Sequence, residues 1–128
     1  MFRFLSPSGL LQIAAVSFSS NVTVEFFLND FSSKSNIIDR IGKIHYTGGV
    51  TETGLALSMV HDSVLSPVHG ARSSVAQVVM VITDGLSQNM QFTASTAALL
   101  RNDGVHVFAI GKTVLMLLCC RRWRWWWW

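Results

Sequence analysis

The strongest constraint on the fold is a run of five apolar residues, 78–82, that stops just before Asp84. A strand that is apolar on both faces is typical of the centre of a parallel sheet. A helix is predicted next, over residues 91–102, with Gly104 as its C-terminal cap, and then a strand over residues 105–110. Strand, helix and strand in this order indicate right-handed parallel crossovers. The sequence therefore predicts a layered α/β fold.

The first part of the chain predicts a β-hairpin. Residues 11–18 are almost continuously apolar, as in a buried strand. Turn-forming residues follow at 19–21, and residues 22–26 then alternate between apolar and polar side chains. The apolar start of the chain, up to Val16, also has features of a signal peptide, although a strand of the domain is the preferred interpretation.

Two helices are predicted between the hairpin and a loop at residues 66–76. The first follows an N-cap at Ser32 or Ser33. Its face toward a sheet is expected to consist of four isoleucines at helical spacing, Ile37, Ile38, Ile41 and Ile44. The second begins near Glu52, and its apolar stripe is expected to consist of Leu55, Ala56, Met59 and Val60.

The last residues differ in composition from the rest of the chain. All five tryptophans lie in the last six residues, and three of the ten basic residues are Arg121, Arg122 and Arg124. Without these three, the chain contains seven basic and seven acidic residues and is neutral. No basic surface for nucleic acid is therefore expected. We therefore predict one domain at residues 1–112 and an apolar, Arg- and Trp-rich tail at residues 113–128.

Four segments resemble the von Willebrand factor type A domain. Residues 48–57 are similar to its Gly-Gly-x-Thr-x-Thr-Gly-x-Ala-Leu segment, and residues 79–87 to its strand that ends in Thr-Asp-Gly-x-Ser. Residues 70–72, Gly-Ala-Arg, precede that strand as in the collagen and matrilin branch, and residues 107–111 are similar to a later strand. The resemblance spans residues 10–112 and implies a Rossmann-like, three-layer α/β fold.

The resemblance also implies a Mg²⁺ site at the strand ends. The family builds it from three loops, and Thr51 and Asp84 match the ligands of the second and third. The first loop, Asp-x-Ser-x-Ser, does not occur in this sequence. Since Mg²⁺ prefers six oxygens, we expect weak ion affinity or none. Two alternatives stay open from the residues alone: Thr51 as a helix N-cap, and Asp84 as a turn cap.

The missing loop has a consequence for the sheet. In the family, the first strand lies in the middle of the sheet, between the hairpin and the strand at residues 78–82. That strand and the first helix have no counterpart in this sequence. We therefore expect an incomplete fold with two open inner strand edges, and such edges favour aggregation.

The resemblance implies an extracellular adhesion module that binds a matrix protein such as collagen. No nucleophile–base arrangement is present in the sequence, so we do not expect an enzyme. Asn21 begins an Asn-Val-Thr glycosylation acceptor. No metal-ligand spacing relates the histidines, which are expected to be ordinary surface or strand residues: His45, His61, His69 and His106. The alternative function is attachment to a membrane interface through the tail.

Overall fold

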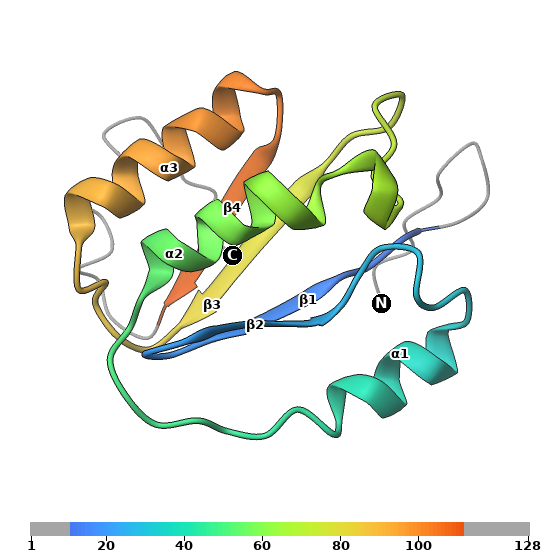
Figure 1. The fold of residues 1–128 in the computed structure, drawn as a ribbon, viewed down its shortest axis with the longest axis horizontal. Coiled ribbons are helices and arrows are strands. Elements are labelled where there is room, and N and C mark those ends of the chain that lie inside the picture. The colour runs from blue at the N-terminus through green and yellow to red at the C-terminus, as the bar shows by residue number, and fades with distance from the viewer. Residues whose placement is uncertain (1–10, 112–128) are drawn as a thin grey trace, which may run out of the picture.

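Two pairs of strands form the β-structure of residues 11–111, the part of the chain that the computed structural model describes. β1 (Ala15–Phe18) and β2 (Val22–Phe26) form an antiparallel hairpin. β3 (Val78–Thr83) and β4 (His106–Gly111) pair in parallel. Figure 1 shows the hairpin between α1 and the β3–β4 pair. The predicted hairpin and the predicted parallel crossover are confirmed.

The two strand pairs form separate sheets within the described residues. No ladder of hydrogen bonds joins β1 or β2 to β3 or β4 there. Each pair therefore has an inner edge without a strand partner in residues 11–111, as the resemblance implies. The layered α/β fold is present, but its sheet is divided.

β1 is shorter than predicted, because residues 11–14 lie outside the strand. Its partner β2 ends at Phe26, where the chain turns away: the Phe27 N–H donates to Asp30 Oδ2 at 2.8 Å. The pairing also has an irregularity between Ala15 and Val16. The apolar run therefore continues beyond the point where its partner strand stops.

Five helical segments connect the strands. They are α1 (Lys34–Ile41), α2 (Thr53–Met59), the π-helical turn η1 (Val60–Val64), the 3₁₀ turn η2 (Pro67–His69) and α3 (Met90–Asn102). Ser33 caps α1 as predicted, since its hydroxyl accepts a hydrogen bond from the Asn36 N–H. Asn89 caps α3 in the same way through the Phe92 N–H. Gly104 follows α3 with a φ of +83°, which confirms its predicted place.

The isoleucine face of α1 was predicted wrongly. Ile37 is buried, but Ile38 is 58% exposed and Ile41 is 48% exposed. The helix ends at Ile41, so Ile44 lies beyond it. An eight-residue helix presents only about two turns, which is too little to align four such side chains on one surface.

The apolar stripe of α2 also differs from the prediction. Leu57 and Ala56 are buried, whereas Leu55 is 47% exposed. The reason lies at Gly54, where a Cβ atom would come 2.5 Å from Phe92 Cδ1 of α3. This close approach turns the face that carries Gly54 and Leu57 toward α3, and Leu55 toward solvent.

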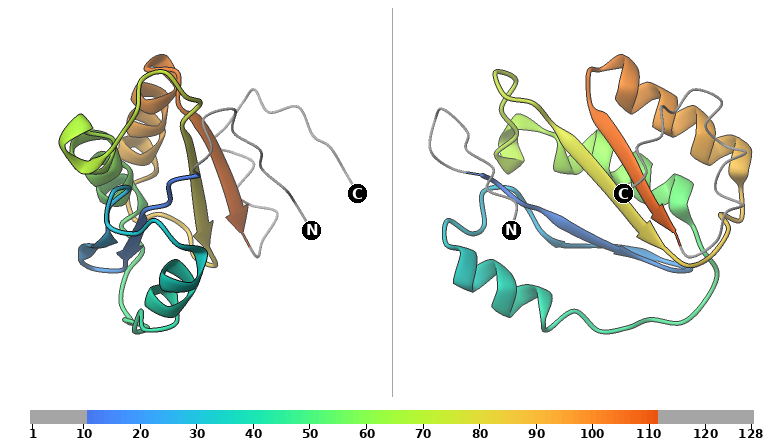
Figure 2. Two further views of the ribbon diagram at one scale, coloured as in Figure 1. Left: turned by 90° about the vertical axis from the view of Figure 1, so that its right-hand side faces the viewer. Right: turned by 180° about the vertical axis from the view of Figure 1, so that it is seen from behind.

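The core lies between β3–β4 and the helices α2 and α3, which cover the same face of this strand pair (Figure 2). Its buried members come from all four elements and the turn before β4: Leu57, Val81, Leu100, Val105 and Val107. Alternate β3 residues point away from this core, and Met80 and Ile82 are 57% and 69% exposed. Within the described residues, β3 therefore has one covered face and one strand partner, unlike the central strand that its apolar run predicts.

Two predictions concern residues outside 11–111. The tail at residues 113–128 and most of the signal-peptide interpretation fall there. Within the described part, none of the helices combines the length and the apolar character that crossing a bilayer requires.

Candidate functional site

Thr51 and Asp84 lie in two loops that the fold brings into contact. Asp84 directly follows β3, and Gly85 comes next in the turn. A Cβ atom on Gly85 would lie only 2.6 Å from Thr51 Oγ1. The Gln88 N–H also donates to the Thr51 carbonyl oxygen at 3.0 Å. The two residues singled out from the sequence therefore share one site.

The Thr51 loop is also fixed to the end of the hairpin. The Glu52 N–H donates to the Ser19 carbonyl at 3.2 Å. The Val50 N–H donates to Ser20 Oγ at 3.2 Å. Three chain segments thus meet at this point: the tip of the hairpin, the loop before α2 and the turn after β3. This junction lies at the carboxyl end of β3, where open α/β sheets place their ligands.

A cavity of about 240 Å³ opens between the hairpin and β3 at this junction. Its walls come from β1, from the loop before α2 and from the end of β3. The oxygen-bearing side chains on its wall are Ser17, Ser19, Tyr46, Thr47, Thr51, Thr83 and Asp84. The cavity therefore lies where the two open strand edges face each other.

Neither structural alternative explains Thr51 or Asp84. Glu52 is the N-cap residue of α2, and no side chain caps this helix. In the turn after β3, Thr83 has the capping role, because its Oγ1 accepts from the Gly85 N–H at 3.2 Å. Asp84 is exposed and makes no hydrogen bond or ion pair within residues 11–111. Its carboxylate is available for a ligand.

The described residues do not fit a complete Mg²⁺ site. Asp84 is the one carboxylate on the cavity wall, and the other oxygens there belong to neutral hydroxyls. Residues 11–111 contain no group of three His, Cys, Asp or Glu side chains that could hold a metal ion. Magnesium needs near-octahedral oxygen coordination and retains several waters. This donor set is too small to hold the ion firmly.

Two histidines have roles that the sequence spacing did not predict. Hydrogen bonds with the Asp62 and Asp103 carboxylates raise the pKa of His61, and the same contact with His61 lowers the pKa of Asp62. His69 stacks on Phe27, with ring centroids 3.7 Å apart. The His61–Asp103 and His69–Phe27 pairs join residues that are distant in the sequence, so only the fold reveals them.

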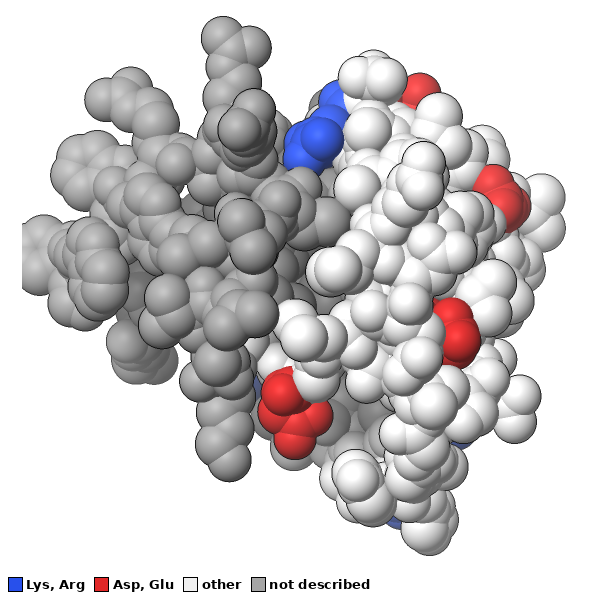
Figure 3. Space-filling view, turned by 90° about the vertical axis from the view of Figure 1, so that its left-hand side faces the viewer, with Lys and Arg blue, Asp and Glu red and all other residues white. Residues whose placement is uncertain are grey.

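Among the described residues on the face drawn in Figure 3, the side chains of Lys, Arg, Asp and Glu lie apart from one another. A parallel β–α–β unit with loops that meet at the strand ends defines an α/β domain of the ligand-binding type.

The chain belongs to the von Willebrand factor type A domain family, whose model matches residues 6–115. It is similar to the human collagen alpha-1(XX) chain, with 39% identity over 101 residues. It is also similar to the Xenopus laevis von Willebrand factor A domain-containing protein 2, with 38% identity over 100 residues. These matches cover 79% and 78% of this chain, but only 8% and 12% of the relatives. The predicted collagen-like branch is confirmed.

Solved structures of the same fold support this assignment. The mussel byssus proximal thread matrix protein 1, with a zinc-occupied MIDAS motif, matches with a TM-score of 0.76 and 31% identity. The match covers 84% of this chain and 28% of that one. The manganese-loaded Plasmodium vivax TRAP protein matches with a TM-score of 0.71 and 22% identity, over 84% of this chain and 43% of that one. At this identity, the TRAP comparison concerns the fold alone.

Proposed function

We propose that this chain is a protein-binding module of the extracellular matrix, which contacts a collagen or another matrix protein and performs no catalysis. The meeting of the Thr51 loop with the Asp84 turn at the carboxyl end of β3 carries this proposal. Family membership and the similarity to collagen chains support it. An exposed carboxylate beside a hydroxyl-lined cavity suits a polar contact with a partner protein.

In this proposal, divalent ions contribute little to binding. Similar proteins are known with zinc or manganese bound. Here Thr51 and Asp84 supply one hydroxyl and one carboxylate, so an ion would depend on waters or on the partner for its other ligands. Any ion held in this way would be bound weakly.

Extracellular localisation is part of the same proposal, and it follows from the similarity to collagens. Asn21 supports it, because this residue is exposed in the turn of the hairpin, where an enzyme could reach it. The acceptor sequence at residues 21–23 meets the requirement for N-glycosylation.

Binding of the full chain to immobilised collagen, measured by surface plasmon resonance, tests the proposal. We expect weak, saturable binding that Asp84→Asn reduces and that Asp39→Asn, a matched change on the exposed face of α1, leaves unchanged. Equal effects of both substitutions, or no binding to any matrix protein, would contradict the proposal. Co-sedimentation with liposomes, with and without residues 113–128, tests the alternative role of the tail.

A further inference from the structure

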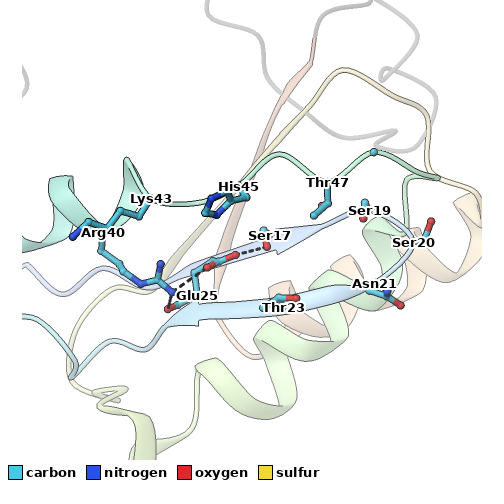
Figure 4. A pocket seen from close by; sticks show the side chains of 11 residues that line it. Ser17, Ser19, Ser20, Asn21, Thr23, Glu25, Arg40, Lys43, His45 and Thr47 are labelled. Atoms are coloured by element: carbon cyan, nitrogen blue, oxygen red, sulfur yellow. Dashed lines mark hydrogen bonds and ion pairs between the residues drawn. The ribbon is translucent and has the colours of Figure 1, made fainter.

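A second, larger concavity of about 640 Å³ lies on the hairpin, away from β3. Figure 4 shows it between the hairpin strands and the segment that runs from the end of α1 to Thr47. We name it the hairpin groove. It shares Ser17, Ser19 and Thr47 with the cavity described above, but it does not include Thr51 or Asp84.

Most of the side chains that line the hairpin groove carry a polar or charged group. None of the eleven lining residues has a hydrocarbon side chain, and five of them carry a hydroxyl. The hydroxyls of Ser19, Thr23 and Thr47 make no hydrogen bond with another described residue. Ligand pockets in proteins are usually lined mainly by apolar and aromatic side chains. A ligand with several hydroxyl or charged groups therefore suits this groove.

One ion pair organises the floor of the groove. Arg40 Nη2 donates to the Glu25 carbonyl at 3.2 Å and to Glu25 Oε2 at 3.3 Å. The Ser17 hydroxyl donates to the other oxygen, Glu25 Oε1, at 2.6 Å. Both carboxylate oxygens of Glu25 are thus engaged, and its side chain is only 13% exposed. The groove therefore has no free carboxylate for a metal cation.

Arg40 retains donors for a ligand. A guanidinium has five N–H groups, and both of its bonds within the described residues come from Nη2. Its side chain is 37% exposed, so the remaining donors are within reach of the groove. A guanidinium is suited to carboxylate and sulfate groups, which it can bind with two parallel hydrogen bonds.

Two further basic side chains line the groove beyond Arg40. Lys43 pairs with Asp39 at 2.6 Å, but both side chains are about two-thirds exposed, at 65% and 67%. Such surface pairs contribute little, so Lys43 can turn to a ligand at low cost. His45 follows on the same segment. Among the lining residues, Arg40 and Lys43 carry two positive charges against the one negative charge of Glu25, and Asp39, which lies outside the wall, offsets Lys43 while that pair is intact.

We propose that the hairpin groove binds a short acidic oligosaccharide, with its sulfate or carboxylate groups on Arg40 and Lys43. The free hydroxyls of Ser19, Thr23 and Thr47 would bind the hydroxyl groups of the sugar. A peptide with large apolar side chains is disfavoured, because none of the lining residues has a hydrocarbon side chain. Binding here uses neither Thr51 nor Asp84.

Isothermal titration calorimetry with a heparin-derived tetrasaccharide tests this site on the full chain. Arg121, Arg122 and Arg124 are replaced by Ser in every sample, because they would attract any polyanion. Lys43→Ala combined with His45→Ala should weaken binding about tenfold or more, as expected for the loss of charge-assisted hydrogen bonds. The matched variant Lys34→Ala, at the other end of α1 and outside the groove, should change it less than about twofold.

Three outcomes would overturn the proposal. The first is that the tetrasaccharide shows no measurable binding. The second is that Lys34→Ala weakens binding as much as the combined Lys43→Ala and His45→Ala variant does. The third is equally tight binding of a hexaglutamate peptide, which would show that charge alone is recognised. Neutral maltotetraose should not bind, and circular dichroism of each variant separates loss of the site from loss of the fold.

Discussion

His61 Nε2 lies 2.8 Å from Asp103 Oδ2, and this contact joins the turn η1 to the residue that ends α3. The second ring nitrogen, Nδ1, lies 2.6 Å from Asp62 Oδ1. An imidazole can donate from both nitrogens only in its protonated form. The folded chain therefore favours the charged histidine.

The stability of the fold should consequently depend on pH through His61. Its pKa is raised in the folded state, first by the hydrogen bond to Asp62 and then by that to Asp103. A raised pKa stabilises the fold below the unfolded value of about 6.5, and the contribution is lost as the pH rises through the folded value. We expect His61→Gln to lower the melting temperature more at about pH 5.5 than at about pH 8.5.

The acid limit of this effect is set by Asp62. Its pKa is lowered, mainly by the hydrogen bond with His61, so its contribution is lost only at pH values below the usual carboxylate range. His45→Gln is the control, because no described contact ties this side chain to a carboxylate. A melting-temperature difference between wild type and His61→Gln that grew with pH would contradict the prediction.

Leu100 is the fully buried side chain of the core, with 0% exposure, whereas its neighbour Leu99 is 54% exposed. Leu100→Ala should lower the free energy of unfolding by about 2–5 kcal/mol, because it removes buried apolar surface and leaves a cavity. Leu99→Ala should change it by less than about 0.5 kcal/mol. Urea unfolding monitored by circular dichroism measures both. Similar losses in the two variants would show that the core is not packed as described.

The contact between Gly85 and Thr51 can be tested by a double-mutant cycle. Gly85→Ala should destabilise the fold by about 1–3 kcal/mol, because its methyl group would overlap Thr51 Oγ1. Thr51→Ala removes that oxygen, so the double variant should recover part of the loss. Gly48→Ala is the matched control, since no atom lies within 4 Å of its added Cβ. Strict additivity of the two changes would contradict the contact.

Magnesium affinity should be weak. A site with one carboxylate and neutral hydroxyls is expected to bind Mg²⁺ no more tightly than about 1 mM. Isothermal titration calorimetry of the full chain with MgCl₂ and MnCl₂ measures this affinity, with Asp84→Ala as the variant that removes the carboxylate. Micromolar binding that Asp84→Ala abolishes would contradict the expectation.

Asn21 should carry an N-linked glycan when the chain is directed through a secretory pathway. The side chain is exposed in the hairpin turn, and Thr23 completes the acceptor sequence. Treatment with a glycan-removing amidase should increase the gel mobility of the secreted chain but not that of Asn21→Gln. An unchanged mobility for both would show that the acceptor is not used.

The elements and their connections were predicted well because they depend on local signals. Ser33 as an N-cap, Gly104 after α3 and the apolar run of β3 each act through neighbouring residues. The meeting of Thr51 with Asp84 was predicted through family resemblance. The periodicity of the sequence alone does not predict that these two loops meet.

Other features depend on contacts between distant residues, which a single sequence does not reveal. Leu55 is exposed because Gly54 lets α2 approach Phe92, a residue 38 positions away in the chain. His61 was expected to be an ordinary surface or strand residue, although Asp103 lies 42 residues further on. The hairpin groove likewise depends on where the segment after α1 crosses β1 and β2 (Figure 4).

The division of the sheet has a consequence for the order in which the molecule opens. The main apolar cluster draws its buried members from α2, α3, β3, β4 and the turn before β4, while the hairpin adds only the partly buried Phe18. Regions with fewer buried contacts open at lower free energy than the core. The amide protons of β1 and β2 should therefore exchange with solvent faster than those of β3 and β4. The hairpin would then open locally while the β3–β4 pair and its helices stay folded.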